Sequence, residues 1–203
     1  MRHDTVNHFL IRPMLHAPYF FLASCLLALV ASGPASADPI PLAELAKPGR
    51  VMMLRHAIAP GIGDPPGFRI DDCATQRNLD DNGRRQAQAL GKQLAKAGVT
   101  APRIYSSQWC RCLETARLLQ LGPVTALPAL NSFYQQTQNR EAHIAELRAF
   151  LAKLPVDGPP VILVTHQFTI NVFTDAGAPS GGGSVFQLNG SGAPRWLGSL
   201  PAD

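Results

Sequence analysis

Two short apolar runs constrain this chain more than any other feature, because each of them ends in a histidine. They are Val51–His56, which reads Val-Met-Met-Leu-Arg-His, and Val161–His166, which reads Val-Ile-Leu-Val-Thr-His. Unbroken apolar runs of this length are typical of interior strands in a sheet that is covered on both faces. Ligands of such sheets bind just beyond the carboxyl ends of the strands. We therefore expect His56 and His166 to meet at one edge of a sheet and to mark a functional site.

Predicted strands and helices alternate along the rest of the chain. A helix is expected from Asp80 to about Ala97, because acids stand at its start and Gly98 follows it as a terminator. Strands are expected at residues 50–54, 103–105, 124–127, 161–164, 185–188 and 195–200, and further helices at 109–121, 140–154 and 166–175. Asn189–Gly192 is a hairpin signal between the last two strands. This order predicts a three-layer α/β/α sandwich with a mainly parallel central sheet and a C-terminal β-hairpin.

The composition of the chain is that of a globular protein. Of its 203 residues, 46% are hydrophobic and 16% are charged, and the formal net charge is +4. The basic residues form no run and no stripe interleaved with aromatic side chains, so nucleic acid is not expected as a partner. A small anionic ligand fits this charge pattern better.

The first 37 residues have the features of a secretory signal peptide. Arg2 and Arg12 precede an apolar stretch, Tyr19–Val30, that is too short for a comfortable transmembrane span. Ala35–Ala37 then offers an Ala-x-Ala cleavage site. We therefore expect residues 1–37 to be removed and residues 38–203 to form an exported domain, periplasmic or secreted, without a stable membrane span.

The N-terminus has two other possible interpretations. Met14 is an alternative start, because the positively charged region before the apolar stretch is long. The segment Leu22–Cys25 resembles a lipoprotein box, but the apolar run continues past Cys25 through Val30, where a mature lipoprotein would turn polar. We therefore favour cleavage after Ala37 over lipid anchoring at Cys25.

Three cysteines remain once Cys25 is removed, namely Cys73, Cys110 and Cys112. An odd number in an oxidising compartment predicts one disulfide and one spare thiol. Cys112 is expected inside a helix, where a small buried thiol is ordinary. The preferred disulfide pair is therefore Cys73 with Cys110.

The surroundings of His56 suit a nucleophile that attacks phosphorus. Such a histidine must be neutral at one ring nitrogen, and the guanidinium groups of Arg55 and Arg111 would disfavour its protonated form. The same groups match phosphate oxygens and neutralise the charge of a transferring phosphoryl group. His166 would supply another donor to those oxygens. These four side chains predict a pocket that needs no metal or cofactor, in which the phosphoryl group passes to His56 and water releases it.

Four segments carry a resemblance to a known family: Leu54–Ala57, Arg77–Gly83, Ser106–Ala116 and Val164–His166. Together they resemble the histidine phosphatase (phosphoglycerate mutase-like) superfamily over essentially all of residues 38–203. Each segment alone is a weak signal, but four in order on the expected elements are specific. The resemblance implies the phosphoglycerate mutase-like fold, with His56 as the residue that becomes phosphorylated. It also implies that Arg55, Arg111 and His166 complete the phosphate pocket around a small phosphorylated substrate.

The chain departs from the family pattern at the proton donor. Acid phosphatases of the superfamily carry aspartate directly after the second histidine, where this chain has Gln167. Mutase-type members carry a glutamate just after the edge strand, where this chain has Leu130–Phe133, so mutase activity is not expected. Two readings stay open: either the acid is Asp64, Asp71 or Asp72 from the long loop after the first strand, or the substrate has a leaving group that hardly needs protonation.

Other chemistries fit the sequence less well. A cysteine-based phosphatase needs Cys-x-x-x-x-x-Arg, and neither Cys110 nor Cys112 has that spacing to Arg117. A zinc site on the two strand-terminal histidines would need a third ligand such as His143, and the neighbouring arginines would repel the cation. The Gly-x-Ser-x-Gly motif of serine hydrolases is absent from the sequence.

The sequence therefore predicts a metal-independent phosphatase that hydrolyses a phosphomonoester or phosphoramidate through a covalent phosphohistidine on His56. The export signal and the long loop resemble exported bacterial members linked to phosphorylated lipopolysaccharide sugars, which suggests an envelope phosphosugar as substrate. The alternative from another class is a non-catalytic protein that binds phosphate or a phosphosugar and lacks the general acid. His56 argues against that alternative, because simple binding does not require a nucleophile.

Overall fold

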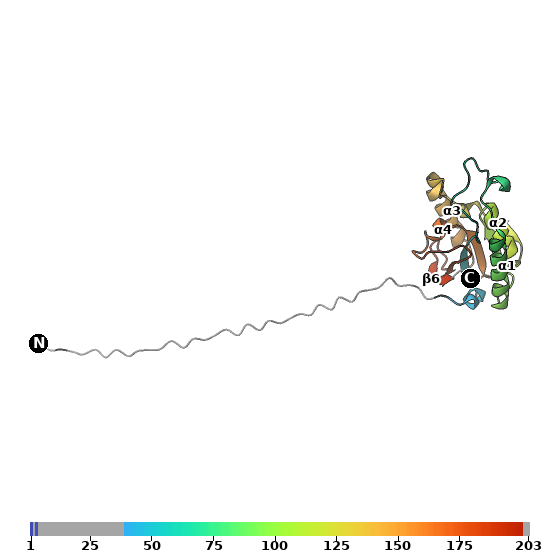
Figure 1. Ribbon diagram of the computed structural model, residues 1–203. Coiled ribbons are helices and arrows are strands. Elements are labelled where there is room, and N and C mark those ends of the chain that lie inside the picture. The colour runs from blue at the N-terminus through green and yellow to red at the C-terminus, as the bar shows by residue number, and fades with distance from the viewer. Residues whose placement is uncertain (2, 4–38, 201–203) are drawn as a thin grey trace. The chain divides into compact units, whose positions relative to one another are not determined.

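A central sheet organises the part of the chain that the computed structural model describes, which is residues 1, 3 and 39–200 (Figure 1). Within residues 39–200 the sheet has six strands in the order β3-β2-β4-β1-β5-β6. The strands are β1 (Arg50–Arg55), β2 (Arg103–Ser106), β3 (Val124–Ala126), β4 (Val161–Thr165), β5 (Gly183–Gln187) and β6 (Arg195–Leu200). The four strands from β3 to β1 are parallel, whereas β5 and β6 pair antiparallel beside them. The mainly parallel sheet with a terminal hairpin is therefore confirmed.

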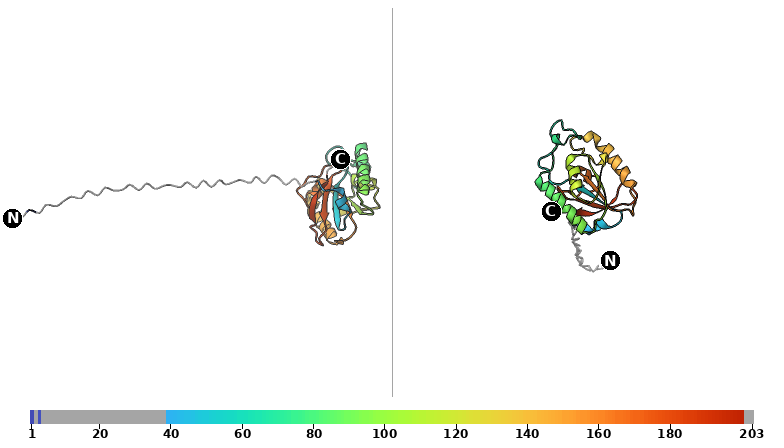
Figure 2. Two further views of the ribbon diagram at one scale, coloured as in Figure 1. Left: turned by 90° about the horizontal axis from the view of Figure 1, so that it is seen from below. Right: turned by 90° about the vertical axis from the view of Figure 1, so that its right-hand side faces the viewer.

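Helices cover both faces of this sheet, as the right-hand view of Figure 2 shows for α1 and α3. The helices are α1 (Asp81–Lys96), α2 (Cys110–Leu118), α3 (Arg140–Ala152) and α4 (Gln167–Ile170), with short 3-10 turns η1 (Leu42–Ala46), η2 (Cys73–Thr75), η3 (Pro128–Leu130) and η4 (Thr137–Asn139). On one face, Met52 and Leu54 pack with α1 and α2, and on the other face Val51 and Met53 pack with α3. This alternation follows from the two-residue period of a strand and confirms the three-layer α/β/α sandwich.

The register of β1 and β4 brings their carboxyl ends together. Leu54 pairs with Val164 and Arg55 with Thr165, so the next residue of each strand is a histidine at the same edge. The backbone N–H of His56 donates to the carbonyl of Thr165 at 3.1 Å, which continues the pairing by one residue. Both strands are buried from end to end apart from the terminal arginines of β1, because layers cover both faces.

Most element bounds match the sequence-based expectation to within a few residues, but the helix predicted at 166–175 is wrong. Only Gln167–Ile170 is helical. The side chain of Asn171 donates to the carbonyls of Thr174 and Ala176, which competes with helical hydrogen bonds. The segment after it also holds β-branched and aromatic residues of low helix propensity. The chain therefore turns away after one helical turn.

Two further observations concern helix ends. The helix predicted at 109–121 spans Cys110–Leu118 and ends as the backbone of Gln120 adopts a positive φ of 56°. The side chain of Asp80 caps α1 by accepting from the N–H of Gly83 at 2.7 Å, as the acids at its start led us to expect.

The predicted signal peptide, its cleavage site and Cys25 lie outside the described residues, apart from Met1 and His3. None of the helices within residues 39–200 is long and apolar enough to cross a membrane.

Candidate active site

A cavity of about 190 Å³ lies at the sheet edge where β1 and β4 end, and it brings together all four residues of the predicted pocket. Its lining consists of Arg55, His56, Gly61, Ile62, Gly63, Arg77, Arg111, Ser132, Tyr134, Gln135, His166, Gln167 and Phe168. A larger cavity of about 560 Å³ lies beside α1, but none of the four predicted residues lines it. We therefore place the candidate chemistry in the smaller cavity, where charged and nucleophilic groups converge.

His56 is held as a neutral ring with one nitrogen unprotonated. Its Nδ1 lies 2.8 Å from the carbonyl of Ala57, and because a carbonyl only accepts, Nδ1 carries the proton and Nε2 has a free lone pair. Burial, followed by the charge of Arg111, lowers the pKa of His56 from 6.5 to about 3. An uncharged imidazole with a bare nitrogen in an anion-binding pocket is the form that a nucleophile requires.

The loop after His56 is fixed by packing against two helices. The N–H of Ala57 donates to Oγ1 of Thr115 in α2 at 3.0 Å. Gly83, in the first turn of α1, lies so close to the carbonyl of Ile58 that an added Cβ would come within 2.0 Å of that oxygen. Only glycine permits this approach, so the identity of residue 83 helps to set the position of the nucleophile.

His166 is also buried, and its ring is held by a polar cluster on the α2 side of the sheet. Its Nε2 lies 2.9 Å from Oγ of Ser107 and 3.5 Å from Sγ of Cys112. The hydroxyl of Ser107 in turn donates to Oδ1 of Asn131 at 3.2 Å. Burial, followed by the charge of Arg111, lowers the pKa of His166 well below 6.5. The rings of His56 and His166 are 5.6 Å apart, edge to face.

Arg55 and Arg111 each present unpaired guanidinium nitrogen to this region. Nη1 of Arg55 donates to the carbonyl of Ala178 at 3.0 Å, while its Nε is buried without a hydrogen-bond partner. Arg111 is 3% exposed, and its Nε is likewise buried and unpartnered. A buried donor without an acceptor costs free energy unless a ligand supplies one. The two arginines therefore indicate a site for an anion with several oxygens.

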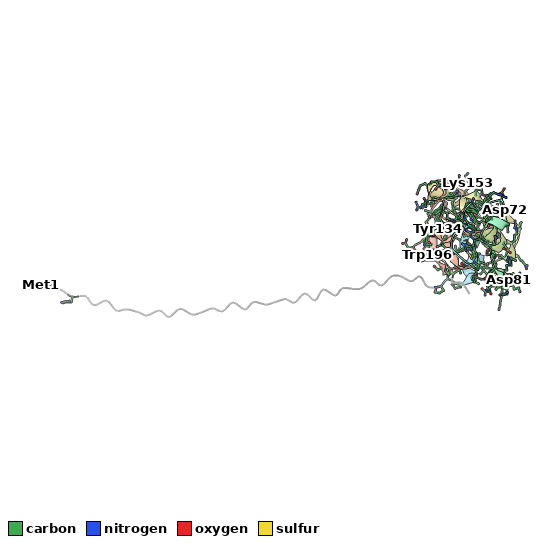
Figure 3. The ribbon with its side chains drawn as sticks, turned by 45° about the horizontal axis from the view of Figure 1, so that its top comes forward. Met1, Asp72, Asp81, Tyr134, Lys153 and Trp196 are labelled. Carbon is green, nitrogen blue, oxygen red and sulfur yellow. A yellow bond between two sulfur atoms is a disulfide. The ribbon has the colours of Figure 1, made fainter. Side chains whose placement is uncertain are left out.

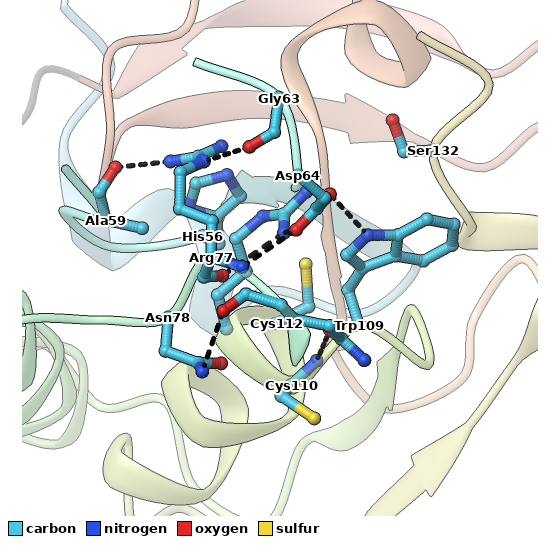
Figure 4. Close-up of polar contacts among 12 residues, drawn as sticks. His56, Ala59, Gly63, Asp64, Arg77, Asn78, Trp109, Cys110, Cys112 and Ser132 are labelled. Atoms are coloured by element: carbon cyan, nitrogen blue, oxygen red, sulfur yellow. Dashed lines mark hydrogen bonds and ion pairs between the residues drawn. The ribbon is translucent and has the colours of Figure 1, made fainter. Parts of the chain in front are cut away.

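Arg77 is a third arginine of the pocket, for which the sequence alone predicted no role. Its Nε donates to the carbonyl of Gly63 at 2.8 Å and its Nη1 donates to the carbonyl of Ala59, so the loop holds the guanidinium in place (Figure 4). Arg77 opens one of the four segments that resemble the family, and this was the signal that could have found it. Three guanidinium groups therefore line the cavity.

Asp64 lies beside Arg111 rather than in the cavity lining, which corrects its assignment as a candidate acid. Its carboxylate accepts from Nη1 of Arg111 at 2.8 Å, from Nε1 of Trp109 at 2.9 Å and from the N–H of Arg77 at 3.0 Å. Burial raises the pKa of Asp64, but these hydrogen bonds and the charge of Arg111 outweigh it and leave the pKa below 3.8. An ionised carboxylate has no proton to give. Asp64 positions Arg111, and Figure 4 shows it beside the Trp109 indole.

Asp71 and Asp72 do not reach the cavity either. The Asp71 side chain is 82% exposed and pairs with Arg69 at 3.7 Å. Asp72 pairs with Arg69 at 2.7 Å and caps η2 through the N–H of Ala74. Asp72 and Tyr134, which lines the cavity, lie apart from each other in Figure 3. Neither aspartate has the setting of a general acid, and the described cavity lining contains no carboxylate at all.

A disulfide joins Cys73 to Cys110, with Cα atoms 5.6 Å apart, so the preferred pair of the sequence analysis is present. It ties the loop before α1 to the first residue of α2, next to Arg111. Cys112 is free and buried, and burial raises the pKa of its thiol to about 12. His143, the possible third zinc ligand of the sequence analysis, lies on α3 and is half-buried. No group of three histidine, cysteine or acidic side chains in the described residues is placed to hold a metal ion.

Comparisons with known proteins agree with this architecture. The family model of the histidine phosphatase superfamily, branch 1, matches residues 71–134. That range contains Arg77 and Arg111 but neither histidine. No curated protein sequence matches the chain. Over residues 71–134 the chain is therefore similar to the histidine phosphatase superfamily, and the solved structures below share its fold.

Three solved structures show the likeness of fold. The first is a SixA-type protein from Agrobacterium tumefaciens assigned as a phosphohistidine phosphatase, with 22% identity, coverage of 77% of this chain and 99% of that one, and a TM-score of 0.51. The protein histidine phosphatase SixA in complex with tungstate has 16% identity, 75% and 97% coverage, and a TM-score of 0.55. A mycobacterial glucosyl-3-phosphoglycerate phosphatase with inorganic phosphate has 18% identity, 76% and 97% coverage, and a TM-score of 0.52.

Proposed function

We propose that this protein is a phosphatase that works through a covalent phosphohistidine on His56. The observation that carries the proposal is the neutral His56 ring, whose unprotonated Nε2 belongs to a cavity lined by three arginines. Structures of the same fold bind tungstate or inorganic phosphate, which supports an oxyanion as the ligand. The guanidinium groups would neutralise the negative charge of the substrate before the bond to phosphorus forms.

In the first step, Nε2 of His56 attacks phosphorus and the bond from phosphorus to the leaving group breaks. The leaving group takes that bond's electron pair, and Arg55, Arg77 and Arg111 stabilise the charge on the three equatorial oxygens. His166, beside them, would donate to the same oxygens only as the protonated ring, because the neutral ring gives its Nε2 proton to Ser107. In the second step, a water oxygen attacks phosphorus, the bond from phosphorus to Nε2 breaks, and inorganic phosphate leaves with the proton of the water passing to solvent.

The cavity lining constrains the leaving group, because it contains no carboxylate that could protonate it. General acid catalysis is worth about 10²–10⁴-fold, and most of that is lost for a strongly basic leaving group without an acid. We therefore propose phosphomonoesters of acidic alcohols and phosphoramidates as substrates. A phosphorylated imidazole can bring its own proton on its second nitrogen, so it leaves as a neutral molecule.

The test is a series of phosphates with leaving groups of increasing basicity, combined with rapid acid or base quenching of the wild-type enzyme. We expect a base-stable, acid-labile phosphoenzyme that is absent from the His56→Asn variant. We also expect rates that fall steeply as the leaving group becomes more basic. Activity should persist in EDTA, since the arginines supply the positive charge. A phosphoenzyme in the His56→Asn variant, or a complete loss of activity with EDTA, would contradict this mechanism.

The lack of a carboxylate in the cavity lining also favours a second candidate, a non-catalytic protein that binds phosphate or a phosphosugar. Such a protein would bind inorganic phosphate as the proposed enzyme does but would form no phosphoenzyme with any substrate of the series. The quench experiment therefore separates the two functions. An envelope phosphosugar stays in the substrate panel because one structure of this fold is a phosphatase of a phosphorylated sugar derivative.

We also propose, from residues 1–37 alone, that the protein is exported to the periplasm or secreted. Fractionation of cells that express the full chain should recover a shortened protein that begins at Asp38 outside the cytoplasm. Recovery of the full-length chain in the cytoplasm would contradict export, and a lipid on Cys25 would favour the anchored form.

A further inference from the structure

The rim of the candidate active site, formed by Ile62, Tyr134 and Phe168, is apolar. Its floor, by contrast, is formed by the three arginines and the two histidines. Ile62, Tyr134 and Phe168 line the cavity although their side chains are 89%, 46% and 48% exposed. Among the described residues seven large hydrophobic side chains are exposed, and these are three of them. Exposed apolar side chains that gather at a cavity mark a binding surface, whereas scattered ones need no explanation. The rim therefore has the character of a subsite for a part of the ligand that is not phosphate.

The two aromatic rings of the rim form a stacked pair. The centroids of Tyr134 and Phe168 are 5.0 Å apart and the ring planes differ by 16°. Phe168 lies in the first turn of α4, two residues after His166. The end of β4 therefore positions the side chains of both His166 and Phe168. Tyr134 is placed by its neighbour Gln135, whose amide accepts from the N–H of Asp64 at 2.7 Å and donates to its carbonyl at 3.1 Å. The pair is thus held next to the phosphate floor.

Both amide side chains of the rim, Gln135 and Gln167, are already engaged within the protein. The amide of Gln135 is used on both sides by Asp64. Oε1 of Gln167 accepts from the N–H of Ala178 at 3.1 Å, and its Nε2 donates to Asn171 at 2.6 Å. A sugar is recognised by directed hydrogen bonds to its hydroxyls, and both of these amides are committed elsewhere. The rim favours a flat apolar group over a polyhydroxylated one.

The absence of a carboxylate from the cavity lining independently favours an aromatic leaving group. Without a carboxylate in the cavity lining, the leaving group must be weakly basic. Oxygen or nitrogen attached to an aromatic ring is far less basic than the oxygen of an alkyl alcohol or a sugar, because the ring delocalises the electron pair. The group that can leave unaided is therefore also the group that an aromatic rim can hold.

We propose that Ile62, Tyr134 and Phe168 form a leaving-group subsite for an aromatic or heteroaromatic ring joined directly to the phosphoryl group through oxygen or nitrogen. This inference rests on the proposed phosphatase function and adds the substrate class to it. The phosphoryl group occupies the arginine floor, and the ring lies against the rim in an offset or edge contact with Tyr134 and Phe168.

The experiment separates ring contact from leaving-group acidity by comparing substrates that differ in one property. Phenyl phosphate and hexafluoroisopropyl phosphate have leaving groups of similar acidity, but only the first has a ring. N-phosphoimidazole and glucose 6-phosphate complete the panel as a heteroaromatic and a sugar substrate. We expect wild-type kcat/KM to favour the phenyl ester over the fluorinated alkyl ester by about tenfold, the value of one or two aromatic contacts.

Phe168→Leu and Tyr134→Leu keep apolar bulk but remove one ring each. Each variant should lower the preference for the phenyl ester about threefold or more, through KM, while competitive inhibition by inorganic phosphate stays at the wild-type value. Ile70→Ala is the matched control, because Ile70 is an exposed apolar residue that does not line the cavity. The control should keep the full preference.

Equal wild-type rates on the two matched esters would overturn the subsite, as would a preference for glucose 6-phosphate over both. An unchanged preference in both leucine variants, with normal phosphate inhibition, would also overturn it. These outcomes leave the phosphatase function intact, since substrate would still be hydrolysed. Failure of the proposed function looks different: no substrate is turned over and no phosphoenzyme forms, although inorganic phosphate binds.

Discussion

One half of the candidate active site is built on the ends of two buried strands, and the other half, called the loop half, on an irregular loop and the first turn of α2. The sheet half comprises Arg55, His56 and His166, whose positions follow from the register of β1 with β4. The loop half comprises Arg77 and Arg111 with their partner Asp64, and it is held by side-chain hydrogen bonds and a disulfide. The sheet half is therefore rigid through burial of apolar residues, while the loop half depends on a few polar contacts.

Mutations in the two halves should therefore affect the enzyme in different ways. A change in the sheet half should remove a chemical group and leave the domain folded. A change in the loop half should shift the position of an arginine and therefore affect binding of the phosphoryl group. The following substitutions and conditions test that division, beginning with the largest effect.

His56→Ala should abolish turnover, with a loss of at least about 10⁴-fold in kcat, because the nucleophile is removed. Inorganic phosphate should still bind, since the arginines remain. The measurement is kcat on phenyl phosphate together with calorimetric titration of phosphate. Residual activity near the wild-type rate would show that another group attacks phosphorus.

Arg77→Met should lower kcat/KM by about 10²–10³-fold, the cost of losing one charge-stabilising donor. Arg85→Met serves as the control, because Arg85 is exposed on α1 and lies outside the candidate active site. The two variants lose the same charge, so long-range electrostatics affect both. Equal kinetics of the two would remove Arg77 from the site.

Asp64→Asn should lower kcat/KM by up to about 10²-fold, because a misplaced Arg111 binds the phosphoryl group poorly. The loss should be equal for phenyl and alkyl phosphates if Asp64 positions Arg111. A loss that grows with the basicity of the leaving group would instead restore Asp64 as the general acid. Asp71→Asn, on the exposed part of the same loop, should behave as wild type.

Replacing both Cys73 and Cys110 by serine should lower the free energy of unfolding by about 3–4 kcal/mol, given the separation of 37 residues. The kinetic constants should change less, because Asp64 still links the loop to Arg111. Urea denaturation gives the stability, and steady-state kinetics on the folded variant give the activity. A collapse of kcat in a variant that is still folded would mean that the disulfide, not Asp64, sets the loop half.

Lowering the pH should destabilise the domain through its two buried histidines. The pKa of His56 is about 3 in the folded protein and 6.5 when exposed, so the unfolded chain binds a proton first as the pH falls below 6.5. The stability present above pH 6.5 is then lost towards pH 3, by at most about 1.4 kcal/mol per pH unit for each histidine. Thermal unfolding between pH 7 and 4 should show a shallower slope in His56→Ala. An identical slope would contradict the lowered pKa.

The sheet half could be predicted from the sequence because the hydrophobic pattern that indicates a buried strand is local. Apolar runs that end in histidine identify buried strands, and parallel strands share one edge for their carboxyl ends. Arg55, His56 and His166 therefore come together without knowledge of any distant contact. The sequence predicts Arg111 near the start of the helix expected at residues 109–121.

The loop half could not be predicted in the same way. Asp64 is one of three aspartates in the loop, and nothing in the sequence distinguishes the buried carboxylate from the exposed ones. Its partners are 13 residues away at Arg77 and 47 away at Arg111, so its position depends on the finished fold. The contact of Tyr134 with Phe168 is equally non-local. Such contacts carry no periodic signal.

The free thiol of Cys112 has a consequence for how the domain is made. It lies two residues from Cys110, so during oxidative folding Cys73 has two competing partners on the same segment of chain. Once the sheet and α2 have packed, Cys112 is buried and its pKa is raised to about 12. Its thiol therefore stays protonated and does not exchange with the Cys73–Cys110 disulfide. The order of events therefore matters: collapse before oxidation protects the native pairing, whereas oxidation of the extended chain would let a misbridged form accumulate.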